Sequence, residues 1–174
     1  MAGTDQNKPL AINVMGVTGC GKTTVAEALA GALGADFIEG DALHPAENVE
    51  KMSRGEPLTD EDRAGWLESI GRALETNLGE NRSTVTTCSA LKKTYRDTLR
   101  AHAPELIFVF LDISRETSYA RVSHRPGHFM PASLVDSQFD TLQRPGADER
   151  HLKVDGTLPI EDIVAATLDY LRTL

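Results

Sequence analysis

The chain has 174 residues, which is enough to bury a sizeable core in one α/β domain and leaves little room for a second. Its 18 basic and 26 acidic residues give a net charge of −8, which argues against binding nucleic acid or anionic lipid through bulk electrostatics. Two cysteines are too few for a disulfide framework. Since we find neither a secretory signal nor an apolar span of about 18 residues, we expect a cytoplasmic protein with no membrane partner.

Strands and helices are predicted to alternate along the chain. Residues 1–9 are polar and are expected to form a loose tail. Apolar, partly β-branched runs predict strands at 10–15, 36–38, 84–88, 106–111 and 151–154. Apolar residues at helical spacing predict helices over 25–33, 45–54, 62–78, 92–102, from about 116, over 132–142 and from about 159. This alternation predicts one domain, residues 1–174, with a parallel sheet covered by helices on both faces.

A glycine-rich segment, GVTGCGKT at 16–23, lies between the first strand and the first helix and matches G-x-x-x-x-G-K-[ST]. Glycines allow the backbone to approach a phosphate closely, and the loop amides and helix N-terminus direct partial positive charge at it. In this pattern Lys22 bridges the β- and γ-phosphates and the Thr23 hydroxyl ligates Mg²⁺. The alternative, a glycine-rich turn that matches by chance, is disfavoured by the flanking strand and helix. The predicted nucleotide-binding residues are Gly16, Val17, Thr18, Gly19, Cys20, Gly21, Lys22, Thr23 and Thr24.

Two acidic residues, Glu39 and Asp41, follow the second strand at the sheet edge where ligands bind in parallel sheets. Residues two apart in an extended segment face the same way. Asp41 is therefore assigned to orient or deprotonate an acceptor hydroxyl, and Glu39 to bind the metal through a water. The alternative is a solvated acidic turn in which Asp41 caps a helix.

A basic cluster follows the third strand at the same edge: Lys92, Lys93 and Arg96, with the Ser89 hydroxyl beside it. Together with His44, it would suit an anionic acceptor rich in hydroxyl groups. The alternative is an exposed basic face of a helix, because charge runs are usually solvated.

A second basic stretch, over about 121–132, is the candidate lid. It contains Arg121, Arg125 and His128, together with a proline and a glycine that can act as hinges. An arginine placed over the transferring phosphoryl group contributes on the order of 10³–10⁵ in turnover. The alternative is an ordinary surface loop.

The motifs favour a small phosphotransferase. Neither N-K-x-D nor a D-x-x-G after a strand is found, which argues against a GTPase switch, and helicases or transporters need a longer chain. No histidine pairs with cysteine at zinc spacing. A nucleoside monophosphate kinase is an alternative, although only 5% of residues are aromatic and a nucleoside acceptor favours stacking partners. A non-catalytic, nucleotide-dependent binding protein is a further alternative.

The chain resembles the gluconokinases, small P-loop kinases that phosphorylate D-gluconate at its 6-hydroxyl. The resemblance rests on MGVTGCGKTT (15–24), EGDALHPAENVEKMSRGEPLTDEDRAGWL (39–67), CSALKKTYRDTLR (88–100), GHF (127–129) and QFDTLQRPGADE (138–149). It implies a five-stranded sheet of order 2-3-1-4-5, related to nucleoside monophosphate kinases, and usually a homodimer. It also implies MgATP as donor, with ADP and 6-phospho-D-gluconate, which enters the pentose phosphate or related routes, as products. The chain departs from the family pattern at Cys20, commonly a serine or another small residue, and at Glu39, often an aspartate.

These assignments predict how the two substrates lie. The cations after the third strand would bind the carboxylate of gluconate, and Asp41 would face its 6-hydroxyl. Lys22, Arg121 and Arg125 would hold the γ-phosphate of ATP. Because such a transfer depends mostly on positioning and charge, Asp41 is expected to matter more for aiming the hydroxyl than for its basicity.

Overall fold

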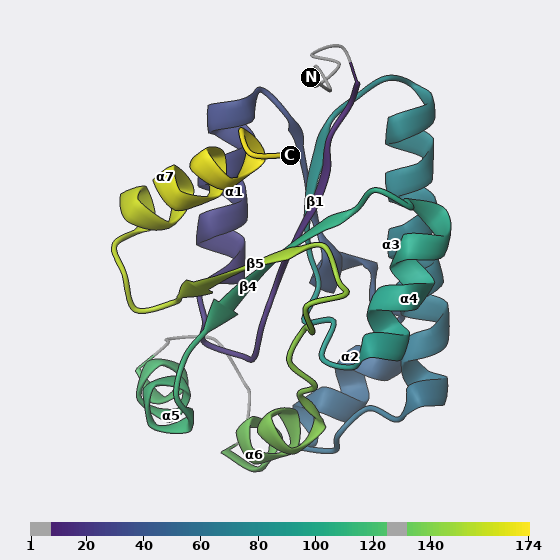
Figure 1. Ribbon diagram of the computed structural model, residues 1–174. Coiled ribbons are helices and arrows are strands. Elements are labelled where there is room, and N and C mark those ends of the chain that lie inside the picture. The colour runs from purple at the N-terminus through teal and green to yellow at the C-terminus, as the bar shows by residue number, and fades with distance from the viewer. Residues whose placement is uncertain (1–7, 125–131) are drawn as a thin grey trace.

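The fold is a three-layer α/β sandwich around one parallel sheet (Figure 1). The computed structural model describes residues 8–124 and 132–174. Within them five parallel strands occur in the order β2-β3-β1-β4-β5, as the resemblance implies, and the predicted α/β class is confirmed. The strands are β1 (Ala11–Met15), β2 (Asp36–Glu39), β3 (Thr84–Thr87), β4 (Ile107–Asp112) and β5 (His151–Asp155).

Helices cover both faces of the sheet, with α1 and α7 on one face and α3 and α4 on the other (Figure 1). The helices are α1 (Lys22–Leu33), the 3-10 helix η1 (Gly40–Leu43), α2 (Ala46–Ser53), α3 (Asp60–Gly79), α4 (Lys93–His102), α5 (Arg115–Ser123), α6 (Ala132–Thr141) and α7 (Ile160–Leu171). In the described parts of the chain, none of these helices combines the length and apolar character needed to cross a membrane.

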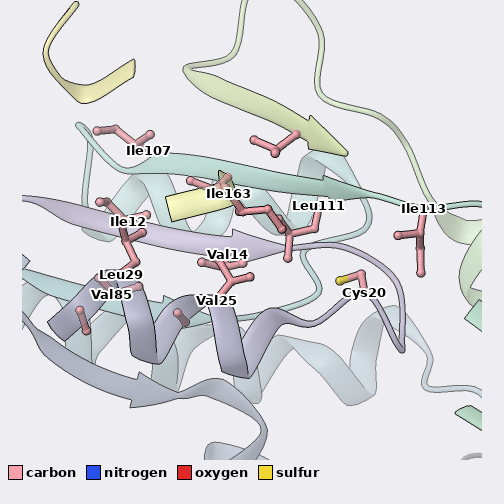
Figure 2. Packing of buried hydrophobic residues seen from close by; sticks show 14 of the residues in the cluster. Ile12, Val14, Cys20, Val25, Leu29, Val85, Ile107, Leu111, Ile113 and Ile163 are labelled. Atoms are coloured by element: carbon pink, nitrogen blue, oxygen red, sulfur yellow. The ribbon is translucent and has the colours of Figure 1, made fainter. Parts of the chain in front are cut away.

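The core is divided by the sheet into two apolar clusters. All five residues of β1 are buried, as expected for a central strand covered on both faces. Figure 2 shows one cluster, in which Ile12 and Val14 of β1 pack with α1, β4 and α7. The other cluster joins α3 and α4 to the opposite face of the sheet. Burial on both faces fixes the strands, and therefore the loops that leave their carboxyl ends.

The start of one helix and the bounds of the predicted lid differ from the sequence prediction. Helix α3 begins two residues earlier than predicted because Thr59 and Asp62 form a capping box, in which each side chain accepts the other's backbone N–H. The predicted lid over 121–132 is also corrected at both ends, since residues 121–123 belong to α5 and α6 begins at residue 132. The rest of that segment, 125–131, lies outside the described residues, as do residues 1–7 of the predicted tail.

Candidate active site

The phosphate loop, residues 16–21, leaves the carboxyl end of β1 and leads directly into α1. Gly16, Gly19 and Gly21 adopt φ angles of 146°, 79° and 94°, a region that residues with a Cβ rarely enter. A Cβ at Gly16 would lie 2.8 Å from Cys20 Sγ, so the loop folds tightly onto itself. The loop therefore has the conformation in which backbone amides surround a phosphate at a helix N-terminus.

The predicted nucleotide-binding residues differ in whether their side chains can reach a nucleotide. Val17 and Cys20 are 2% and 1% exposed, so only their backbones can face a nucleotide. Lys22 lies across the loop, where its Nζ donates to the carbonyl oxygens of Gly16 (3.1 Å) and Val17 (3.2 Å). These backbone contacts are ones that a phosphate can replace.

The hydroxyl of Thr23 meets the carboxylate of Glu39 at the end of β2. Thr23 Oγ1 donates to Glu39 Oε2 at 2.6 Å, and Thr87 Oγ1 donates to Glu39 Oε1 at 2.5 Å. Among the residues placed by the structure, no group of three or more His, Cys, Asp or Glu side chains forms a metal cage. A hydroxyl and one carboxylate at the phosphate loop instead fit Mg²⁺, which keeps several waters and is bound mainly through substrate phosphates.

A cavity of about 390 Å³ opens beside the phosphate loop, within the usual size range of small-molecule sites. Its walls come from the phosphate loop, the segment after β2, the start of α3, the loop after β3, and α6. The lining residues with polar groups include Thr18, Lys22, Asp41, His44, Arg63 and Ser89. The structure thus places two predicted opposing groups, the lysine of the loop and the aspartate after β2, in the wall of one cavity.

Asp41 is the second residue of η1, whose N-cap is Glu39, so it is not the N-cap of that helix. Its side chain is 70% exposed. His44 Nε2 is 3.9 Å from Asp41 Oδ1, and the His44 ring stacks on Trp66 with centroids 3.9 Å apart. Burial lowers the pKa of His44, the nearby Asp41 opposes this, and Arg63 lowers it further. Because Asn48 Nδ2 contacts His44 Nδ1 at 3.3 Å, the neutral ring directs an Nε2–H group toward the carboxylate.

Arg63 is a cavity residue that sequence reasoning missed. It is only 8% exposed, and its Nη1 donates to Tyr95 Oη at 2.8 Å. Tyr95 Oη donates in turn to Asp60 Oδ1 at 2.5 Å. The available signal was its place on the inward stripe of α3, three residues before Trp66, where an apolar residue is expected. Arg63 forms no direct ion pair with a carboxylate among the described contacts, although Asp60, beyond the phenol, feels its charge; the guanidinium can therefore still bind an anionic ligand in the cavity.

The basic cluster after β3 does not form the predicted acceptor site. Arg96 is fully buried and paired with Glu149, so the prediction that it binds substrate is wrong. Lys92 Nζ contacts Asp60 at 2.9 Å, and Lys93 Nζ contacts the neighbouring Asp97 at 3.2 Å. Neither lysine lines the cavity, and the geometry gives no support to their predicted contact with the acceptor. A run of three cations in the sequence was therefore mistaken for one site.

Arg121 is anchored behind the phosphate loop rather than carried on a hinged lid. Its guanidinium donates to the carbonyl oxygens of Gly19 (3.0 Å) and Gly156 (3.1 Å). The structure therefore corrects its assignment to a swinging segment, while its contact with the loop keeps it beside the predicted phosphates. Arg125 and His128, the other predicted lid residues, lie outside the described residues.

Comparisons with known proteins identify the family of the chain. The family model for shikimate kinases matches residues 18–152. A gluconokinase of Gluconobacter oxydans is 52% identical over 149 residues, which cover 86% of this chain and 84% of that protein. The thermoresistant gluconokinase of Escherichia coli is 44% identical over 160 residues, 91% of each chain. A crystal structure of a gluconokinase from Sinorhizobium meliloti has a TM-score of 0.86 at 48% identity, covering 97% of this chain and 94% of that one. The chain therefore belongs to the gluconokinases, within the shikimate kinase family.

Proposed function

We propose that this kinase transfers the γ-phosphoryl group of ATP to the 6-hydroxyl of D-gluconate, giving ADP and 6-phospho-D-gluconate. One observation carries the proposal: the phosphate-loop lysine, Lys22, and the carboxylate of Asp41 line the same cavity. The gluconokinases that share about half of this chain's residues support the choice of acceptor.

The reacting groups can be assigned from the cavity walls. Asp41 accepts the hydrogen of the 6-hydroxyl and directs its oxygen at the γ-phosphorus, and the His44 ring lies next to the carboxylate, with Nε2 3.9 Å from Oδ1. The new O–P bond forms as the bond between the β–γ bridging oxygen and the γ-phosphorus breaks, and the proton leaves through Asp41. When ATP binds, Lys22 Nζ releases the carbonyl oxygens of Gly16 and Val17 and binds phosphate oxygens instead. Since phosphoryl transfer depends on positioning and charge, these contacts account for most of the catalysis.

We further propose that Arg63 binds the carboxylate of gluconate. Its planar guanidinium can pair with a carboxylate through two parallel hydrogen bonds. Tyr95 and the stacked cation–π geometry, with the guanidinium carbon 5.1 Å from the ring centroid, hold the group in place. This assigns to α3 the role that the sequence had suggested for the cations after β3.

Thr23 and Glu39 would hold Mg²⁺ beside the phosphates, the carboxylate through a water. The metal supplies charge neutralisation on the β- and γ-phosphates when bound. From the family resemblance we also propose a cytoplasmic homodimer of one domain per chain, acting in gluconate utilisation and feeding the pentose phosphate or related routes.

The proposed function is tested by measuring ADP release in the presence of different acceptors. Gluconate alone should stimulate release, whereas stimulation by AMP or CMP would indicate a nucleoside monophosphate kinase. No stimulation by any acceptor would indicate a binding protein. Sedimentation of the same preparation tests the homodimer.

Variants of the two opposing groups test the mechanism. Lys22→Ala should lose activity with every acceptor. Asp41→Asn should retain ATP affinity and lose about 10²–10⁴ in turnover, the usual contribution of a positioned acid or base. Asp169→Asn, on the exposed face of α7, is the matched control and should be fully active. Near-normal turnover of Asp41→Asn would refute the assignment.

A further inference from the structure

The loop after β3, residues 88–91, connects the acceptor side of the cavity to the phosphate loop. Ser89 lines the cavity, and its carbonyl accepts the backbone N–H of Gly16 at 3.3 Å. The next residue, Ala90, has a φ of 46°, in the left-handed region that residues with a Cβ rarely adopt. Such backbone strain persists only where the surrounding structure imposes it, and it is concentrated near functional sites.

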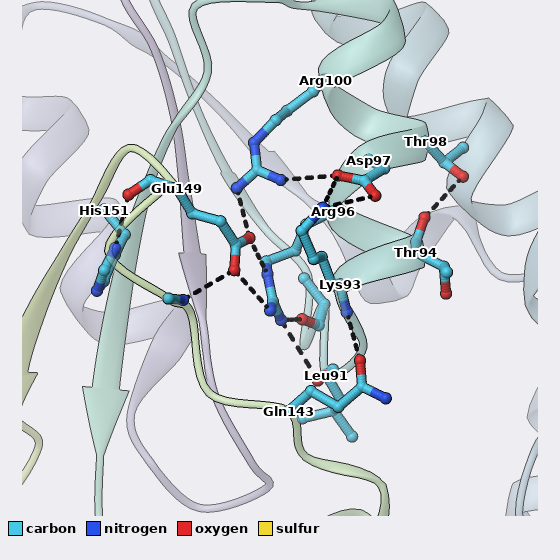
Figure 3. Close-up of polar contacts among 12 residues, drawn as sticks. Leu91, Lys93, Thr94, Arg96, Asp97, Thr98, Arg100, Gln143, Glu149 and His151 are labelled. Atoms are coloured by element: carbon cyan, nitrogen blue, oxygen red, sulfur yellow. Dashed lines mark hydrogen bonds and ion pairs between the residues drawn. The ribbon is translucent and has the colours of Figure 1, made fainter.

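The side chain of Arg96 contacts this loop from the interior of the protein. It reaches back from α4 beneath the loop and is fully buried (Figure 3). Its Nη1 donates to the carbonyl oxygens of Ala90 (2.8 Å) and Leu91 (3.3 Å). The Leu91 carbonyl also accepts the backbone N–H of Gln143 at 2.7 Å. Arg96 thus holds the carbonyl oxygens of two successive residues of the strained loop.

Glu149 in turn fixes Arg96. The two side chains pair through Nε–Oε1 (2.7 Å) and Nη2–Oε2 (3.1 Å), and Glu149 is 8% exposed. Arg100 and the backbone N–H of Gly146 complete the shell of the carboxylate, at 2.7 and 3.0 Å (Figure 3). Burial alone would raise the pKa of Glu149, but hydrogen bonds from the two arginines lower it to about 2. Glu149 is therefore ionised at neutral pH, and it holds Arg96 through two hydrogen bonds.

A buried ion pair is not by itself a source of stability, because desolvation offsets much of the attraction. Well-packed apolar residues often stabilise such a position as much or more. This pair does something that apolar residues could not do: it holds two carbonyl oxygens and, through them, the left-handed turn at Ala90. That turn determines where Ser89 lies relative to Gly16 and the cavity.

We propose that Arg96 and Glu149 are positioning residues for phosphoryl transfer, which hold the strained turn at Ala90 so that Ser89 faces the acceptor in the cavity. The proposal rests on the proposed function only in taking gluconate as that acceptor. It replaces the predicted role of Arg96 as a substrate ligand with an indirect role. Neither residue touches a substrate, so their loss should alter use of the acceptor more than affinity for ATP.

Arg96→Lys is the main test variant. Lysine keeps the charge but cannot contact Glu149 in a fork while also binding two carbonyls. We expect kcat/KM for gluconate to fall about 10–100-fold, since misplacement by about 1 Å has effects of that size. The Kd for ATP should change less than threefold. Glu149→Gln should behave in the same way, because the amide keeps the shape and loses the charge.

Arg100→Lys is the matched control because Arg100 contacts Glu149 but neither loop carbonyl, and its kcat/KM for gluconate should stay within threefold of wild type. All assays are run well below the unfolding midpoint of each variant. An unchanged kcat/KM for gluconate in folded Arg96→Lys would overturn the proposal, as would an equal loss of ATP affinity and acceptor use.

A double variant tests whether Arg96 acts through the backbone of Ala90. Glycine adopts a φ of 46° without strain. Adding Ala90→Gly to Arg96→Lys should therefore raise kcat/KM for gluconate at least threefold above that of Arg96→Lys alone. A double variant no better than Arg96→Lys would contradict this route. If the wild-type protein releases no ADP with gluconate, the proposed function has failed. If the wild type is active and the variants match it, only the positioning role has failed.

Discussion

Gly40, the first residue of η1 and the one that follows β2, is the position where a single methyl group should disturb the site most. It is buried, and a Cβ placed there would lie 1.7 Å from the carbonyl oxygen of Thr87 and 3.3 Å from Ile70 Cδ1. Ordinary contacts begin at 3.4 Å, so Gly40→Ala must separate two backbone segments by more than 1 Å. Thr87 ends β3 and Gly40 begins η1 directly after β2, and the hydrogen bonds of Gly40 oppose their separation.

The expected cost follows from the contacts that this separation breaks. The Gly40 N–H donates to Thr87 Oγ1 at 3.0 Å, and Trp66 Nε1 donates to the Gly40 carbonyl at 2.8 Å. Overpacking costs about 1–3 kcal/mol and each lost hydrogen bond about 0.5–1.5 kcal/mol. We therefore expect Gly40→Ala to lower the free energy of unfolding by about 2–6 kcal/mol.

Urea unfolding followed by fluorescence measures this change directly, since Trp66 is the only tryptophan and contacts Gly40. Gly31→Ala is the control, because that glycine lies in α1 with open space around it and should gain up to about 1 kcal/mol. Turnover should also fall in Gly40→Ala, because Asp41 is the next residue. A midpoint for Gly40→Ala equal to that of wild type would refute the packing described at this position.

Three further predictions concern charged groups. Arg63→Lys should raise the KM for gluconate about 10-fold and leave the KM for ATP unchanged, as initial rates would show; equal changes in both would contradict its contact with the acceptor. Glu39→Gln should raise the Mg²⁺ concentration for half-maximal rate about 10–100-fold in a metal titration, and an unchanged titration would exclude Glu39 from the metal site. Hydrogen bonds to Glu75 and Glu68 raise the pKa of His102, so its stabilisation is complete below pH 6.5 and is lost as the pH rises through the raised value. The stability difference between wild type and His102→Gln should therefore shrink from pH 6 to pH 9 in urea unfolding, whereas a constant difference would contradict it.

The features that the sequence predicted well are those fixed by local spacing. The phosphate loop depends on glycines at positions whose backbone conformation excludes other residues, so its geometry is encoded within eight residues. The strand runs are also local, because a short continuous apolar stretch such as 107–111 is typical of a strand covered on both faces. Once the phosphate loop and the strand order were known, Lys22 and Asp41 were bound to lie near one another, since β3 alone separates β2 from β1.

The assignments that failed depend on burial, which adjacent residues do not reveal. Arg96 and Lys93 lie on one helix three residues apart, yet the first is fully buried and the second is exposed. The partner that makes burial of Arg96 feasible is Glu149, which lies 53 residues later in the chain. A periodicity analysis of α4 would place Tyr95, Arg96 and Leu99 on its inward face, and an arginine there requires a distant carboxylate that only the fold identifies.

The contrast between Arg96 and Arg63 explains how a protein with a net charge of −8 can bind two anionic substrates. Both arginines are buried, but Arg96 is neutralised by Glu149, whereas the hydrogen-bond partner of Arg63 is the phenol of Tyr95. The positive charge of Arg63 therefore adds to that of Lys22 in the wall of one cavity. Surface carboxylates beyond a Debye length of about 8 Å are largely screened at physiological salt, so the local potential depends on these two cations and on the nearby carboxylates, of which Asp41 lies in the same wall. Exchanging the partners, with a carboxylate beside Arg63, would keep the net charge of the chain almost unchanged and abolish the attraction.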